Sequence, residues 1–241
     1  MAEIIPANRI ESLDHVYTRS STSPAKGVSA DGRQWVVKLK GAGPGPLGLL
    51  TEFVALRAAA GMSLNVPYAE PVYLPPDFPW TIGTDEFDGI VQRSFGWNLG
   101  VAFIEGATLA DAQDAGQWGE EFVGNLIQVD RALANTDRAR RNPNILTTPC
   151  GPVAIDFDAC LFLRRAARGM VPTDFPLWPD HLMIGRDGAL PEGRLCPETV
   201  TRAVDEAPRE WAEAVGIDRR TLRSGLVAYC AAWNAAVREE A

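Results

Sequence analysis

Asp137 and Asn142 are the residues whose types and spacing point most directly to chemistry. They lie five positions apart in the segment "NTDRARRNPNIL", which is dense in asparagine and arginine and contains a proline. This composition predicts a loop. An acid and an amide in one loop can direct two oxygen atoms toward one point, where they can hold Mg²⁺ or orient a hydroxyl group. Taken alone, "NTD" also fits an ordinary Asx turn or helix cap.

Three further polar residues follow a meaningful order along the chain. Lys38 lies in a β-rich run, Glu52 lies in the next helical run, and Asp156 follows a short apolar run. A kinase-type phosphotransferase needs a cation for phosphate oxygens, a carboxylate that holds this cation, and hard oxygen ligands for magnesium. Each residue alone has a plainer interpretation, because most lysines and glutamates are solvated surface charges.

The first third of the sequence predicts a small sheet with one helix. Residues 35–39, "WVVKL", predict a hairpin strand on which Val36 and Lys38 share one face, and the Ser-, Gly- and Pro-rich residues before it predict a loop. Residues 47–61 have apolar side chains at helical spacing and predict an amphipathic helix. The runs "VPYAEPVYL" and "DGIVQRSF" predict further strands, the first near a sheet edge because of its prolines.

From about residue 105 the pattern becomes mainly helical, so the predicted fold class is α+β. Residues 117–135 predict a long helix, "GPVAIDFDACL" predicts a short strand that leads into an acidic turn, and the proline-rich residues 172–197 predict a loop. Two or three helices are expected to close the chain. The apolar stripe of the long helix consists of Phe122, Leu126, Val129 and Leu133, and that of the last helix of Leu222, Leu226, Tyr229, Trp233 and Val237.

Composition sets outer limits on function. The chain has 241 residues, 46% of them hydrophobic, a formal net charge of −8 and a pI near 4.9. The acidic balance argues against general affinity for nucleic acid or anionic membranes. The N-terminus lacks the pattern of a signal peptide, no apolar run approaches the roughly 18 residues of a membrane span, and the four cysteines form no C-x-x-C pair. We therefore expect a cytoplasmic protein with reduced thiols.

Five segments, taken in order, resemble the short, stand-alone HipA-like kinases. They lie between residues 20 and 163 and read "TSPAKGVSADGRQWVVKLKG", "GLLTEFVALRAAAGMSLNVPYAEPVYL", "NLGVAFIEGATL", "VDRALANTDRARRN" and "VAIDFDACLF". The resemblance implies a two-lobed protein-kinase-like fold, with a small β-rich N-lobe in residues 1–100 and a larger, mainly helical C-lobe in residues 101–241. It also implies ATP and Mg²⁺ as cofactors.

The same resemblance implies a role for each polar candidate. Lys38 and Glu52 would form the ion pair that serves the phosphates, and Asp137 would be the catalytic acid/base. Asn142 and Asp156 would be the magnesium ligands.

Two backbone segments would complete the nucleotide site. Residues 100–104 would form the hinge that meets adenine, through Ala102, Phe103 and Ile104. Ser21 and Ser23 lie in a loop whose small residues let backbone N–H groups approach phosphates, and this loop would cover the nucleotide. In HipA-like kinases a serine of this loop is often itself modified.

The sequence departs from the family pattern beside both catalytic loops. Ala139 stands where many relatives have a histidine, and Phe157 and Asp158 stand where many have a His-Gly pair. Neither change removes a phosphate or metal ligand. Asp158 is open to two interpretations, an extra metal ligand or a surface acid. The arginines at 138, 140 and 141 are equally open, as a solvated face or as a grip on an anionic substrate.

The function that these features favour is transfer of a γ-phosphate from ATP, with Mg²⁺, to a hydroxyl group, most simply a Ser or Thr of a protein. The alternatives are a pseudokinase or nucleotide-binding regulatory module that acts through a protein partner, and a small-molecule kinase. "DFD" also fits the D-x-D motif of a nucleotide-sugar glycosyltransferase, although that class gives no reason for "NTDRARRN".

Overall fold

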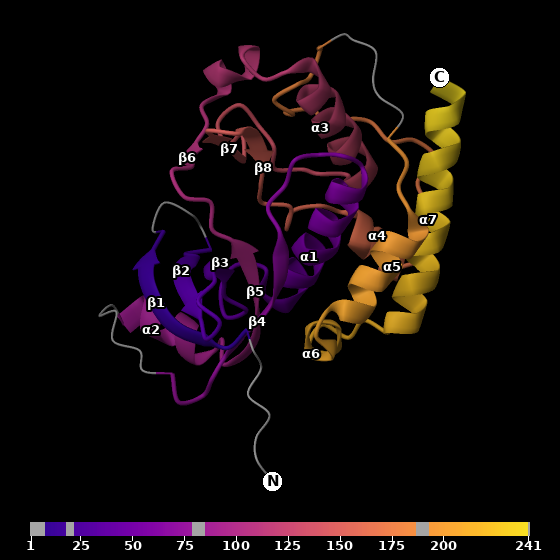
Figure 1. The fold of residues 1–241 in the computed structure, drawn as a ribbon. Coiled ribbons are helices and arrows are strands. Elements are labelled where there is room, and N and C mark those ends of the chain that lie inside the picture. Colours follow the sequence, from indigo (N-terminus) through magenta and orange to yellow (C-terminus); the bar gives the residue numbers. More distant parts are fainter. Residues whose placement is uncertain (1–7, 18–21, 79–84, 187–192, 241) are drawn as a thin grey trace.

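The computed structural model describes residues 8–17, 22–78, 85–186 and 193–240. Within these ranges the first part of the chain forms a five-stranded antiparallel sheet with two helices, and the second part is mainly helical (Figure 1). The predicted α+β class, with the β-rich part first, is therefore confirmed. None of the described helices is both long enough and apolar enough to cross a membrane.

The large sheet has the strand order β1-β2-β3-β5-β4. Its strands are β1 (Ile10–Val16), β2 (Ala25–Ser29), β3 (Gln34–Lys38), β4 (Ala69–Leu74) and β5 (Gly96–Ala102). The predicted hairpin strand is β3, and the strand predicted near an edge is β4, which lies at the edge of the sheet.

The loop predicted before the hairpin strand was wrong in part, because residues 25–29 form β2. The small residues that suggested a loop are needed for close packing: a Cβ atom at Gly27 would lie 3.0 Å from the side chains of Leu13 and Val37. The antiparallel register with β3 places Gly27 opposite Trp35. Small side chains thus let the sheet pack tightly here.

Side chains on the two faces of β3 belong to different hydrophobic clusters. Trp35 and Val37 are buried with side chains of β1, β4 and α2 (Asp85–Gln92), whereas Val36 packs against the cluster that contains α1 (Gly45–Gly61). Strand alternation then directs Lys38 to the same face as Val36, as predicted.

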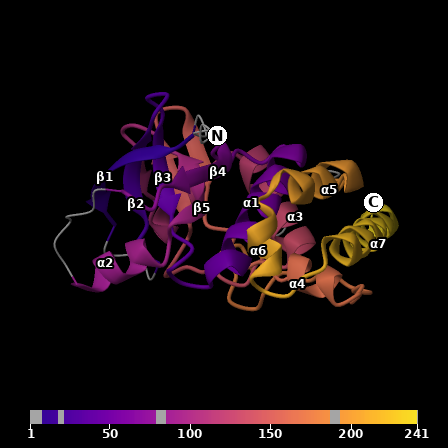
Figure 2. The same cartoon turned by 90° about the horizontal axis from the view of Figure 1, so that it is seen from below.

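Helix α1 is buried almost all round, so its predicted amphipathic character was wrong. Figures 1 and 2 show it between the sheet and the C-terminal helices, and it contacts α3 (Glu120–Leu133), α5 (Pro197–Glu206) and α6 (Arg209–Glu213). Because the sheet covers one side of α1 and the C-terminal helices cover the other, little of the helix is exposed to water.

The strand predicted from "DGIVQRSF" was also wrong, because these residues overlap α2. Ile90 and Val91 favour a strand by propensity, but Phe87 and Val91 lie one helical turn apart and are both buried against the sheet. Burial of this apolar face outweighs the β preference of single residues.

Three short strands and the remaining helices complete the second half. The strands are β6 (Thr108–Leu109), β7 (Ile145–Thr148) and β8 (Gly151–Ala154), and they pair in the order β6-β7-β8. The helices of this half that have not yet been named are η1 (Ala112–Gly116), α4 (Phe162–Ala167) and α7 (Arg219–Glu240). The predicted long helix is α3, and the two or three helices that were predicted to close the chain are α5, α6 and α7. Strands β6 and β7 and helix α4 were not predicted.

Helix α6 ties the large sheet to the C-terminal helices. Trp211 is buried and its indole N–H donates to the carbonyl of Trp97 on β5 at 3.0 Å. Glu210 forms an ion pair with Lys40, just beyond β3, also at 3.0 Å. The sheet is therefore attached to the C-terminal helices directly by α6, and also through its packing on α1.

We predict that Gly225→Ala destabilises the protein. A Cβ atom at Gly225 on α7 would collide with the backbone carbonyl of Ala166 on α4, so the two helices would have to separate. We expect a loss of about 1–3 kcal/mol in the free energy of unfolding, measured by urea titration. Gly61→Ala is the matched control, because its Cβ atom would meet only Thr199 Cγ2 at 3.6 Å. Equal stability of the two variants would contradict the prediction.

Candidate active site

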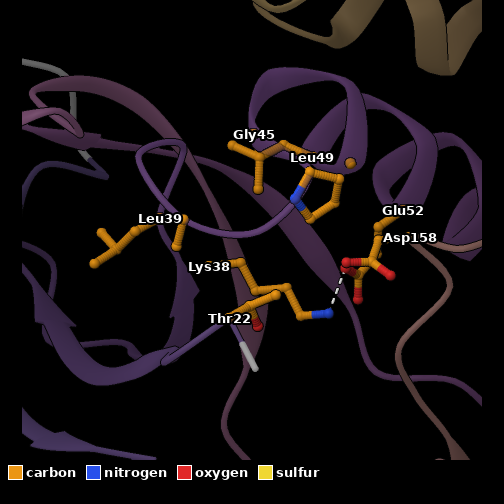
Figure 3. A pocket seen from close by; sticks show the side chains of 10 residues that line it. Thr22, Lys38, Leu39, Gly45, Leu49, Glu52 and Asp158 are labelled. Atoms are coloured by element: carbon orange, nitrogen blue, oxygen red, sulfur yellow. Dashed lines mark hydrogen bonds and ion pairs between the residues drawn. The ribbon is translucent and has the colours of Figure 1, made fainter. Parts of the chain in front are cut away.

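Lys38 and Glu52 meet across the space between the sheet and α1. Lys38 is the last residue of β3, and its Nζ lies 2.5 Å from Oε2 of Glu52, whose side chain is only 2% exposed (Figure 3). The contact exists because strand alternation turns Lys38 toward α1 and because Glu52 lies on the side of the helix that faces the sheet. Two residues that the sequence separates by fourteen positions thus form one buried ion pair.

Asp156 joins the same ammonium from the second half of the chain. It follows β8 with a positive φ of 62°, and its Oδ1 lies 2.6 Å from Lys38 Nζ. Asp158 lies close by, and one carboxylate oxygen each from Glu52, Asp156 and Asp158 lie within 4.8 Å of one another. Hard oxygens gathered in this way fit a divalent cation.

The charges within this cluster do not balance, since three carboxyl groups surround one ammonium. Burial disfavours the ammonium, yet the charges of Asp156 and Glu52 outweigh it and raise the pKa of Lys38. The Lys38 ammonium lowers the pKa of Asp156 despite burial. Lys38 and Asp156 therefore remain a charged pair.

Burial raises the pKa of Glu52 to about 7, against the pull of Lys38 and with the support of the negative charges of Asp156 and Asp158. Burial and the charge of Asp156 also raise the pKa of Asp158. A bound divalent cation would relieve this excess of negative charge.

Asp137 is oriented by amide groups of its own loop. Its Oδ2 accepts hydrogen bonds from Nδ2 of Asn142 at 2.8 Å and from Nδ2 of Asn144 at 3.2 Å. The Asx turn that "NTD" suggested is present, but Asn135 forms it: its side-chain oxygen accepts from the N–H of Asp137 at 3.1 Å. Asp137 Oδ1 accepts no hydrogen bond from any residue that the structure describes.

A buried network that the sequence analysis missed lies beneath this loop. Arg138 Nε lies 2.5 Å from Oδ2 of Asp130 on α3, and the same oxygen lies 2.9 Å from Nε2 of His181. All three side chains have a relative exposure of 0%. Both expected roles of Arg138, a solvated face and a grip on substrate, were therefore wrong, whereas Arg140 and Arg141 are exposed.

Arg138 also connects the Asp137 loop with the loop that carries Asp156. Its Nη1 donates to the carbonyls of Pro143 at 3.1 Å and Asn144 at 2.7 Å, and it lies 3.5 Å from the carbonyl of Ile155, next to Asp156. No spacing pattern predicts this, because an arginine in a polar loop usually projects into water. The sequence signal was the unusual density of asparagine and arginine in the segment.

The predicted hinge residues follow the end of β5. The N–H of Ala102 donates to the carbonyl of Tyr68 at 2.7 Å, and that of Phe103 donates to the carbonyl of Gln34 at 3.1 Å. Sheet hydrogen bonds thus already use these two donors. The N–H of Ile104 donates to no residue that the structure describes, and it is the hinge donor left for a ligand.

The serine-rich loop reaches the ion pair through Thr22. Ser21 lies outside the described residues, and Ser23 is described with a positive φ of 44°. Thr22, Lys38, Gly45, Leu49, Glu52 and Asp158 line a cavity of about 10 Å³ (Figure 3). This cavity has room for about one water molecule and not for a triphosphate, so a nucleotide could enter here only if the loop moved aside.

The comparisons with known proteins reveal a likeness of fold. The chain is similar to the crystal structure of a Helicobacter pylori proinflammatory kinase, CtkA, with a TM-score of 0.58 and 11% sequence identity; the match covers 98% of this chain and 100% of that one. No protein-family model and no curated protein matches the sequence. At this identity the likeness establishes the fold alone, and the predicted two-lobed, kinase-like fold is confirmed.

We predict that Asp130→Ala is strongly destabilising. The variant would leave the Arg138 guanidinium buried without its carboxylate, which costs roughly 3–5 kcal/mol in the free energy of unfolding. Thermal and urea unfolding measure the loss. Asp180→Ala, at an exposed position beside His181, is the control and should unfold like the unchanged protein.

The same pair predicts a pH dependence. Burial opposes ionisation of Asp130, but Arg138 and His181 outweigh it and lower its pKa. A lowered carboxyl pKa gives stability that is present above the unfolded-state pKa and is lost as the pH falls through the folded-state pKa. The stability difference between the unchanged protein and Asp130→Asn should therefore narrow below about pH 4. A constant difference from pH 7 to pH 3 would contradict this assignment.

Proposed function

We propose that the chain is an ATP- and Mg²⁺-dependent kinase that transfers the γ-phosphate to a hydroxyl group, a Ser or Thr of a protein. The observation that carries this proposal is the contact of Lys38 with both Glu52 and Asp156, which brings together the sheet, α1 and the loop after β8. In a chain with a kinase-like fold, a lysine held in this way is suited to bind the α- and β-phosphate oxygens of ATP.

Three residues would hold the metal, and a fourth would keep Lys38 in place for the phosphates. Asp156 and Asp158 would supply carboxylate oxygens, and Asn142 would supply its side-chain oxygen because its Nδ2 already donates to Asp137. Glu52 would hold Lys38 rather than the metal once Asp156 turns toward the cation. Magnesium, when bound, would neutralise charge on the transferred group.

Asp137 would be the base that receives the proton of the attacking hydroxyl. Asn142 and Asn144 hold its Oδ2, so Oδ1 is the oxygen that would face the substrate. An acid fixed by two amide donors keeps one orientation, and such positioning acts mainly in the transition state. Arg138 would support both catalytic loops at once through the carbonyls that it binds.

The nucleotide would lie between the hinge and the serine-rich loop. Ile104 would offer its N–H to adenine, with the backbone and side chains of Ala102 and Phe103 beside it. Backbone N–H groups of the loop that carries Ser21 and Ser23 would approach the phosphates. The lobe boundary that we propose, between residues 100 and 101, falls near the end of β5.

The alternative with most merit is a nucleotide-binding module that has lost catalysis and acts through a regulatory protein partner. A pure binding module has no need for an oriented Asp137 in addition to the Lys38 cluster, and this favours an active enzyme. A small-molecule kinase would use the same residues. Purified protein incubated with γ-labelled ATP, Mg²⁺ and cell lysate separates the three: labelled proteins, labelled metabolites, or no label.

We predict that Asp137→Asn separates binding from turnover. ATP binding with Mg²⁺ should be nearly unchanged, whereas the rate of phosphate transfer should fall by roughly 10²–10⁴-fold, because the base acts in the transition state. Asp156→Asn should weaken both, since it would lose a metal ligand. Calorimetric ATP titrations with and without Mg²⁺, beside transfer assays, test both variants.

Asp174→Asn, at an exposed position, is the matched control for these two variants and should behave like the unchanged protein. Transfer at the normal rate by Asp137→Asn would overturn the kinase assignment. Normal binding of Mg·ATP by Asp156→Asn would overturn the role of that residue alone.

We predict that Lys38→Met and Glu52→Gln are not additive. Lys38→Met removes the phosphate contact, and Glu52→Gln leaves the lysine present but poorly held. Because both changes remove one interaction, the double variant should be little worse than the worse single variant in kcat/KM. Losses that simply multiply would indicate that the two residues act separately.

A further inference from the structure

An open groove lies beside the Asp137 loop, and the proposed chemistry does not use it. It has a volume of about 260 Å³. Residues of η1 and the segment from Leu182 to Arg186 line it, together with Arg140 of the Asp137 loop. We call it the Arg140–Arg186 groove.

The groove is joined to the Asp137 loop by backbone contacts. Ala139 pairs with His181 in an antiparallel bridge, and the N–H of Leu182 donates to the carbonyl of Arg138 at 3.0 Å. Arg140 follows Asp137 by three residues. A chain that lies in the groove would therefore pass close to Asp137.

The floor of the groove is held in place by the buried contact between His181 and Asp130. His181 is fixed by Asp130, which lies in the buried network with Arg138. Leu182 and Met183 are buried and belong to the main core, whereas Ile184 is 51% exposed and presents an apolar surface at the rim. The segment is thus anchored from below and offers both an apolar and a cationic side chain above.

The positive charges of the groove have no acidic partner among the residues that the structure describes. Arg140 is exposed and forms no ion pair there, and the guanidinium of Arg186 reaches across to the carbonyl of Ala115 at 3.4 Å. The nearby acids, Asp111 and Asp114, are occupied by the backbone N–H groups of their own capping box. Two guanidinium groups that have no ion-pair partner among the described residues make this groove locally positive in a chain of net charge −8, and such a groove suits an anionic partner.

We propose that the Arg140–Arg186 groove binds an acidic segment of a protein substrate, so that the enzyme selects Ser or Thr residues with acidic neighbours. This inference rests on the proposed kinase function and names its substrate class. Carboxylates of the segment would bind Arg140 and Arg186, and an apolar side chain would cover Ile184. The open shape of the groove suits an extended peptide, because a small molecule there would keep most of its surface in water.

The test compares peptide binding first, without catalysis. A fluorescent Ser peptide flanked by Glu and Leu is titrated with the protein in an anisotropy assay, beside the same peptide with Gln in place of Glu. The acidic peptide should bind at least about tenfold more tightly, and the difference should shrink with added salt. Equal affinities for the two peptides would overturn the proposal.

Two variants locate the site. Arg140→Ala/Arg186→Ala should lose at least about tenfold in affinity for the acidic peptide, and Arg140→Glu/Arg186→Glu should prefer a peptide with Lys in place of Glu. Arg202→Ala/Arg220→Ala removes the same charge at exposed positions of α5 and α7, and should bind like the unchanged protein. An equal loss in this control would overturn the proposal.

Kinetics then separate this inference from the kinase function. In phosphorylation assays Arg140→Ala/Arg186→Ala should raise KM for the acidic peptide and leave KM for ATP unchanged. Selective binding without any phosphorylation would support the groove and overturn the proposed kinase function. Phosphorylation of both peptides with equal kcat/KM would support the kinase function and overturn the groove proposal. Tighter binding of an RNA oligonucleotide of matched charge than of the acidic peptide would also overturn the groove proposal.

Discussion

The buried ion pair between Asp130 and Arg138 is the interaction on which the Asp137 loop and the Asp156 loop both depend. Asp130 lies on a helix whose place in the core is set by apolar side chains, so it offers a fixed carboxylate below a polar loop. Arg138 transmits that position to the carbonyls around Asn144 and Ile155. His181 extends it to the wall of the groove. One buried charge pair thus sets the relative positions of three segments that no regular secondary structure joins. Such a pair is tolerated because the two charges compensate each other, and because Asn135, His181 and backbone carbonyls bind most of their remaining polar atoms.

The second charged cluster has a different character, because it is unbalanced. Lys38 holds carboxylates from two parts of the chain, and burial leaves Glu52 and Asp158 reluctant to ionise. A structural ion pair has no need for this surplus of acid. A site that receives a divalent cation does have such a need, because the cation compensates the surplus negative charge. The balanced Asp130–Arg138 pair thus fits a structural role, and the unbalanced Lys38 cluster fits a binding site, although both involve the same few loops.

The sequence predicted features that depend on the pattern within one segment, and it missed features that depend on contacts with segments distant in the sequence. Strand alternation was enough to place Lys38 on the face toward α1, and loop composition was enough to single out Asp137 and Asn142. Gly27 was misjudged because its small size serves the contact with Leu13 and Val37, and Val91 because its partner surface decides between helix and strand. Arg138 was missed because its partner lies on another element. Only the three-dimensional structure shows that Arg138, in a polar loop, is paired with the buried carboxylate of Asp130.

Helix α6 restricts the motions that are open to the molecule. With Trp211 bonded to Trp97 and Glu210 paired with Lys40, the sheet cannot rotate away from the C-terminal helices without exposing a buried indole and breaking an ion pair. Helix α1 lies inside that bracket and cannot swing outward alone. The Lys38–Glu52 contact is present in the folded chain, and a displacement of α1 that broke it would also disturb the contacts of α6. Under the proposed function, a regulator would therefore act more readily on access to the Arg140–Arg186 groove than on the position of α1.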